Sequence, residues 1–178
     1  MLELLYQRRS VREFTSREID PVTVDKIIEG LLLSPSGRGS RPWEFIVVDD
    51  RKTIMDLSKS KEHGSSFLKD APLAVVVLGN PEISDTWIED TSIASSYALL
   101  MAESLGLGAC WIQIRGRYHS FGKLSESYVK ELLHIPENLA VESIIAFGFP
   151  DKKPQGYTRQ SLLFEKVHAN IYKNSRGV

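Results

Sequence analysis

The sequence has little of what several large protein classes depend on. Its 178 residues include one cysteine, so no disulfide can form within the chain, as is usual in a reducing compartment. Lysine and arginine (22) are balanced by aspartate and glutamate (23), whereas a general nucleic-acid binder carries a basic excess. The longest apolar runs, such as Leu73 to Leu78, are far shorter than the ~20 residues that cross a bilayer. We therefore expect a cytoplasmic protein that binds neither nucleic acid nor membranes.

Motifs for the commonest catalytic and nucleotide sites are also missing. The four histidines and the single cysteine are scattered and match no zinc-site spacing. Gly116 and Gly122 are separated by one residue more than the glycines of a phosphate loop. Neither 37–39 nor 106–108 completes the dinucleotide-binding fingerprint, and no Gly-x-Ser-x-Gly elbow occurs. The sequence therefore predicts no metal site, no phosphate loop and no hydrolase nucleophile.

What is present is an ordinary globular composition with alternating helical and strand patterns. Hydrophobic residues make up 42% and charged residues 25%, close to the ~45–50% and ~25% of average domains. The periodicity predicts helices over 2–8, 51–60, 85–105 and 125–133, a helix that begins at Asp20-Pro21 and runs to Leu32, and strands over 43–48, 73–78, 109–114 and 141–149. Because the order is not strictly βα, we expect one sheet with mixed strand directions and helices on its faces.

The first candidate site is the arginine-rich segment that follows the first helix. In an extended chain, Arg8, Ser10 and Arg12 would project to one side. Arg9 and Val11 would then point to the other side. Two guanidinium groups with a hydroxyl between them suit a phosphate, because planar Arg binds phosphate oxygens bidentately. The alternative is a solvated surface, since nearby acidic residues balance the charge.

Two other stretches could face a ligand. The loop from Ser34 to Pro42 holds two prolines and two glycines within nine residues, and glycine lets a backbone approach a flat ligand closely. From Gly106 to Ile114 a helix ends, the chain turns and a strand begins, so that backbone amides could face a bound ring. The alternatives are a plain connection for the loop, and a helix end followed by a core strand in which Trp111 only fills space.

Taken together in this order, the three segments resemble the FMN-dependent nitroreductase family. The resemblance rests on Arg-Arg-Ser-x-Arg-x-Phe near the start, Pro-Ser and Pro-Trp-x-Phe-Ile-Val-Val around the loop, Leu-Gly-Leu-Gly-Ala-Cys-Trp-Ile, and Phe-Gly-Phe-Pro at 147–150. It covers essentially the whole chain. It implies an α+β fold with a mixed, mostly antiparallel sheet flanked by helices, and an intertwined homodimer. It also implies a single domain over 1–178, in which 160–178 is a C-terminal arm that wraps the partner.

The same resemblance implies FMN at the dimer interface and assigns its contacts. The implied FMN-binding residues are Arg8, Arg9, Ser10 and Arg12 at the phosphate and ribityl chain, Pro35, Ser36 and Gly37 in a loop from the other subunit, Trp111, Ile112, Gln113 and Ile114 along the isoalloxazine near N5 and O4, and Arg159 at the phosphate. Gly39 and Arg41 stand where the family often has Asn and Gln. The contact to the polar edge of the flavin is therefore expected from elsewhere, with Arg38 and Arg41 as the alternatives.

The function implied is reduction of nitro compounds, quinones or similar electron-poor acceptors. NADPH or NADH would be the electron donor, in a ping-pong reaction through flavin N5. No protein residue is expected to be catalytic, because the flavin carries the chemistry. The chain lacks the helical insert of larger members, so we expect an open pocket. The alternatives are a flavin-binding protein without turnover, another flavin-dependent reaction such as dehalogenation or ring reduction, and a dimeric interaction domain without flavin.

Overall fold

The structure, a computed structural model, describes residues 1–174. The last part of the predicted arm, 175–178, lies outside the described residues. The helices are α1 (Leu2–Gln7), α2 (Pro21–Leu32), α3 (Arg51–Leu57), α4 (Trp87–Ser104) and α5 (Ser125–Leu133). The strands are β1 (Trp43–Val48), β2 (Leu73–Gly79), β3 (Gly108–Gln113) and β4 (Ala140–Gly148).

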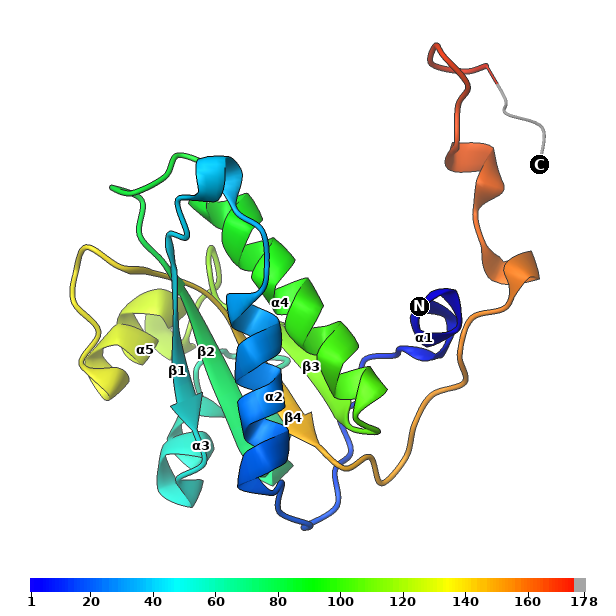
Figure 1. Cartoon of the computed structure of the whole chain (residues 1–178). Coiled ribbons are helices and arrows are strands. Elements are labelled where there is room, and N and C mark those ends of the chain that lie inside the picture. Colours follow the sequence, from blue (N-terminus) through cyan, green and yellow to red (C-terminus); the bar gives the residue numbers. More distant parts are fainter. Residues whose placement is uncertain (175–178) are drawn as a thin grey trace.

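The four strands form one sheet in the order β1-β2-β4-β3 (Figure 1). All three strand pairs are antiparallel. A parallel pairing occurs at an isolated bridge between Ser10 and Ala109, which adds the N-terminal segment to the edge of β3. The predicted α+β fold with a mostly antiparallel sheet is thus confirmed.

Helices cover both faces of the sheet and give it two cores. On one face α2 and α4 lie side by side over the strands (Figure 1), and Ala94, Ala98 and Ala102 of α4 are fully buried there. These small side chains let the helix axis approach the sheet closely. On the other face α3 and α5 pack over Ile112 and Ile144. Each strand alternates its side chains between the two cores, since successive residues point to opposite faces.

The observed elements match the predicted ones within three residues at either end. β1 and α5 have the predicted bounds. α2 begins as expected, with Pro21 in its first turn and the Asp20 carboxylate accepting a hydrogen bond from Thr23 N at 3.0 Å. The helix predicted over 51–60 ends at Leu57, because the Ser58 hydroxyl donates to a carbonyl of the last turn and the chain then turns.

The two ends of the chain run side by side away from the sheet (Figure 1). Tyr157 N donates a hydrogen bond to Tyr6 O at 2.8 Å, and Pro150 forms a bridge with Phe14. Large apolar side chains stand exposed along the C-terminal stretch, namely Leu162, Leu163, Val167, Ile171 and Tyr172. No helix among residues 1–174 combines the length and the apolar character needed to cross a membrane.

Candidate functional site

The arginine-rich segment is extended and lies along the start of β3. Val11 N donates a hydrogen bond to Ala109 O at 3.0 Å, and Ser10 forms a bridge with the same residue. The Val11 side chain is fully buried against Gly108, where a Cβ atom would come within 2.7 Å of it. Glycine at 108 therefore lets the segment dock on the strand. The alternation expected from the sequence follows, with Arg8, Ser10 and Arg12 on the side opposite Val11.

Three of the predicted residues, Arg8, Ser10 and Arg12, lie close enough to the Cys110 thiol to affect its pKa. Burial raises the pKa of this thiol, while the charges of Arg12, Arg8 and Lys61 and a hydrogen bond from Ser10 act in the opposite direction. We call Arg8, Arg12 and Lys61 the cationic cluster. Within residues 1–174, no carboxylate lies at ion-pair distance from any of its members. Unpaired cations beside a hydroxyl are the donor set that a phosphate requires, so the residues present fit that part of FMN.

Lys61 belongs to this cluster, although no pattern in the sequence pointed to it. It follows α3, far from both the arginine segment and β3 in the sequence. Burial lowers the pKa of the Lys61 ammonium, and the nearby charge of Arg117 lowers it further. A cation held in such surroundings gains from an anionic ligand, because the ligand would offset both the desolvation and the repulsion.

Two predicted residues do not join the cluster. Arg9 points to the opposite side, where its Nη1 donates to Gln155 O and its guanidinium stacks 4.7 Å from the centre of the Tyr157 ring. Arg159 is exposed, and its guanidinium lies 4.9 Å from the centre of the Phe164 ring. In one copy of the chain, both arginines thus contact the C-terminal stretch.

The predicted flavin contacts over 111–114, at the end of β3, are called the strip. The strip can present its backbone to a ligand, but not its aliphatic side chains. Ile112 and Ile114 are buried in the core, so their side chains are closed to a ligand. Ala109 O faces the outer edge of the sheet, where it accepts from Val11 N. By alternation, the N–H groups of Trp111 and Gln113 face that same edge. β3 ends the sheet, so these amides could donate to the rim of a flat ring.

The loop before β1 is tightly fixed by hydrogen bonds. The Ser36 hydroxyl accepts from Arg41 N at 2.8 Å, and the Asp90 carboxylate accepts from Gly37 N at 2.7 Å. Arg38 and Arg41 have φ angles of 53° and 49°, which are uncommon for residues with a side chain. Such backbone conformations persist only where the surroundings enforce them, and they often mark ligand contacts.

The end of this loop and the first residue of β1 carry polar atoms that lack a partner. Ser40 Oγ and Trp43 Nε1 are both buried and, among residues 1–174, no atom forms a hydrogen bond with either. Three other buried hydroxyls of the described residues, those of Ser60, Ser125 and Ser143, also lack a partner, so these two atoms do not by themselves mark a ligand contact. β1 and β3 form opposite edges of the sheet, and the loop is therefore distant from the cationic cluster within one chain (Figure 1). That this loop contacts the flavin of a second copy, as the resemblance implies, stays a prediction.

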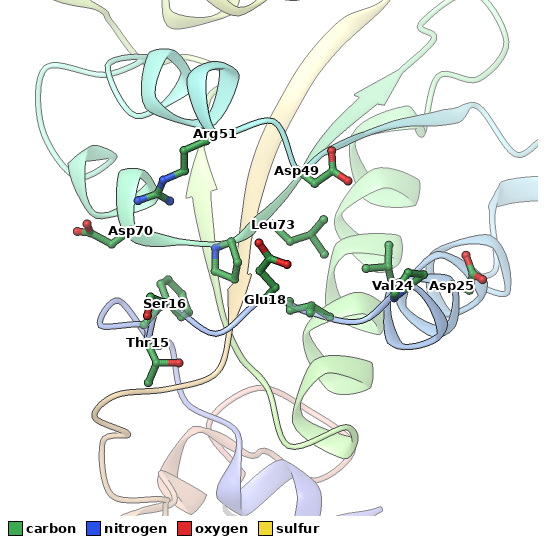
Figure 2. A pocket seen from close by; sticks show the side chains of 13 residues that line it. Thr15, Ser16, Glu18, Val24, Asp25, Asp49, Arg51, Asp70 and Leu73 are labelled. Atoms are coloured by element: carbon green, nitrogen blue, oxygen red, sulfur yellow. The ribbon is translucent and has the colours of Figure 1, made fainter.

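The larger of two described cavities lies elsewhere. It has a volume of about 720 Å³ and opens between the 14–21 segment, the end of β1 and the start of β2. Figure 2 shows the carboxylates of Glu18, Asp49 and Asp70 around it, with Arg51 as the one basic residue among its lining side chains. This excess of negative charge is unsuited to a phosphate. A smaller cavity of about 420 Å³ borders Gly37 and Arg38.

An antiparallel sheet between two helical layers, with a cationic segment on its edge strand, defines the class of protein. The sequence profile of the nitroreductase family matches residues 5–61 and 53–149. The chain belongs to this family, so the resemblance noted in the sequence is confirmed.

Individual proteins resemble it over nearly their full length. An FMN-dependent nitroreductase structure from Clostridium difficile R20291 has 43% identity and a TM-score of 0.95, with 97% of this chain and 100% of that chain covered. A putative NADH dehydrogenase/NAD(P)H nitroreductase from Archaeoglobus fulgidus is 35% identical, with 88% of each chain covered. A protein with the same description from Methanothermobacter thermautotrophicus is 36% identical, with 94% of this chain and 85% of that protein covered.

Proposed function

We propose that this chain reduces nitro compounds, quinones or similar electron-poor acceptors in a ping-pong reaction. It is an FMN-dependent NAD(P)H oxidoreductase of the nitroreductase family. Bound FMN would supply the hydride and electron transfer between the nicotinamide and the second substrate, so the protein needs no nucleophile of its own. The observation that carries the proposal is the cationic cluster, unpaired among the described residues, beside the free edge of β3.

The residues of the cluster would hold the phosphate. A phosphate carries a charge of about −1.5 to −2 at neutral pH, and Arg8 and Arg12 with Lys61 offset it. The Ser10 hydroxyl adds an uncharged donor. Along β3, the buried side chains of Ile112 and Ile114 fix the strand, so that its outward amides need no rearrangement to meet a ligand.

The complete site would form between two copies. The loop with Pro35, Ser36 and Gly37 lies at the β1 edge, so it would serve the flavin held by the partner. The exposed apolar side chains of the C-terminal stretch support a homodimer in which 160–178 wraps the partner, because burying them removes apolar surface from water. We propose that 1–178 forms one domain. The protein would act in the cytoplasm, with NADPH or NADH as its electron donor.

Matched arginine variants test the phosphate assignment. R8A and R12A should each weaken FMN binding about 10- to 150-fold, since a hydrogen bond to a charged group is worth about 1.5–3 kcal/mol. R9A is the control, because the same change there removes contacts to Gln155 and Tyr157 instead. It should lower the melting temperature and leave FMN affinity, measured by flavin fluorescence quenching, unchanged. Full FMN affinity in both R8A and R12A would show that the phosphate lies elsewhere.

Anaerobic reduction separates the enzyme from its alternatives. Purified protein loaded with FMN should lose its absorbance near ~450 nm when NADPH or NADH is added, because the nicotinamide delivers hydride to the flavin. A subsequent nitroaromatic or quinone should restore that absorbance. A flavin that does not bleach would instead favour a binding protein without turnover. Protein that takes up no FMN at all would favour an interaction domain.

A further inference from the structure

Glu142 is the one charged residue of β4, a strand that is otherwise uncharged and largely apolar. It lies in β4, with 2% of its surface exposed. The register between β2 and β4 shifts at this point, because Val77 pairs with Ser143 whereas Leu78 pairs with Val141. Glu142 is therefore the extra residue of a β-bulge. Bulges redirect side chains and are common beside active sites.

The bulged residue Glu142 forms hydrogen bonds with the end of β3 and the residues that follow it. Glu142 O accepts hydrogen bonds from both Ile114 N and Arg115 N at 3.1 Å. Its carboxylate accepts from Arg115 Nε at 2.6 Å and from Gln113 Nε2 at 3.2 Å. One residue of β4 thus fixes the backbone and two side chains where the strip leaves the sheet.

The network continues from Gln113 to the indole of Trp111. Trp111 Nε1 donates to Gln113 Oε1 at 2.9 Å. The indole nitrogen can only donate, so the amide oxygen must face it. The amide nitrogen then faces the Glu142 carboxylate and Arg115 O, which can only accept. The orientation of Gln113 is therefore fixed from both ends, and the Glu142 carboxylate is the one charged acceptor that its amide nitrogen contacts.

We infer that Glu142 is a positioning residue for the flavin strip. Its carboxylate holds Gln113 and, through it, Trp111 in one arrangement, and it pairs the charge of Arg115, whose side chain is 43% exposed. This role rests on the proposed function, in which FMN lies along the outer edge of β3. Without the Glu142 charge, the strip would lose its single arrangement and Arg115 would add an unbalanced positive charge beside the flavin.

The test compares E142Q with E126Q. Glutamine keeps the size of the side chain but has no charge and only one accepting oxygen. It therefore cannot accept from both Gln113 Nε2 and Arg115 Nε as the carboxylate does. Glu126 is the matched control, because it lies on α5 and its carboxylate accepts from Val141 N at 3.0 Å, one residue from Glu142. E126Q removes a carboxylate that anchors the same strand, but it leaves the contacts to β3 in place.

E142Q should weaken FMN binding about tenfold, the effect of losing one charge-assisted hydrogen bond. It should also raise the flavin reduction potential, because an unpaired cation favours the anionic reduced form. E126Q should change the melting temperature alone. If wild type and E142Q bind FMN equally and have equal potentials, Glu142 has a merely structural role and the inference is wrong.

The outcomes distinguish this role from the proposed function. Wild-type protein that takes up no FMN would overturn both, whereas a wild type that binds FMN normally leaves E142Q to decide the role alone. If E142Q does not fold, R115K tests the ion-pair part of this role, since lysine keeps the charge but lacks the Nε donor. Weaker FMN binding by R115K would support that part, and unchanged binding would refute it.

Discussion

The buried carboxylate of Asp90 should hold the Pro35–Arg41 loop in place, and its removal is the sharpest test of that loop. Asp90 lies in the first turn of α4 with 2% of its surface exposed. Its Oδ1 accepts from Gly37 N at 2.7 Å, while Oδ2 accepts from Thr86 Oγ1 at 3.2 Å and Ser84 Oγ at 3.4 Å. One side chain thus joins two loops to the start of a helix.

The cost of D90A can be worked out from these contacts. Alanine leaves Gly37 N, which is partly buried, without its acceptor, and an unsatisfied donor costs about 1–3 kcal/mol. We expect a loss near 2 kcal/mol in the free energy of unfolding, which corresponds to a fall of about 4–8 °C in melting temperature for a chain of this length. D90N should lose about half as much, because its amide oxygen still accepts from Gly37 but without the charge.

Urea denaturation of the apoprotein gives these values, with E89A as the control. Glu89 lies in the same helical turn but is exposed, so its removal should cost only the ~0.3–1 kcal/mol of a charge at a helix N-terminus. FMN titration then tests the loop, since a displaced loop should weaken binding in D90A and leave E89A unchanged. Equal stability of D90A and E89A would refute the reasoning. A destabilised D90A with normal FMN affinity would show that the loop does not reach the flavin.

Three further predictions concern the framework of the site. I144A, in the fully buried centre of β4, should lower the free energy of unfolding by about 2–5 kcal/mol in urea. Hydrogen bonds from Thr23 lower the pKa of Asp20 below 3.8, so its stabilising effect is present above that pH and is lost as the pH falls through the lower folded-state value. The stability gap between wild type and D20A, followed by acid titration of thermal melts, should close accordingly. G37A should destabilise the loop, because its Cβ would lie 2.6 Å from Thr86 Oγ1, and a T86A background should relieve part of this loss in a double-mutant cycle.

Local sequence signals predicted much of the fold. β1 has its predicted bounds because Pro42 precedes a dense run of β-branched and aromatic residues, and the alternation of an extended chain placed Arg9 on the side opposite Arg8. Where a side chain bonded to the backbone, the prediction failed by a few residues, as at Ser58 after α3.

Local sequence patterns did not reveal which distant segments of the chain come together in the fold. Nothing in the sequence placed Lys61 near Cys110, because the two residues belong to segments joined only by the sheet order. Asp90 looked like any acidic residue in a first helical turn. Glu142 did leave a signal, as the single charged residue of a strand predicted to be buried, and a buried charge needs a partner.

The division of the candidate site between opposite edges of the sheet explains why its parts looked weak individually. The cationic cluster and the β3 strip lie at one edge, and the Pro35–Arg41 loop lies at the other. Within residues 1–174, a single chain therefore presents the cationic cluster without the loop, and a loop with strained residues and buried donors that lack a partner. If two copies pack so that the loop of each lies against the strip of the other, one site would contain the cationic cluster, the strip and the loop. In the proposed dimer, the strain at Arg38 and Arg41 would be a property of the assembly and not of the chain alone.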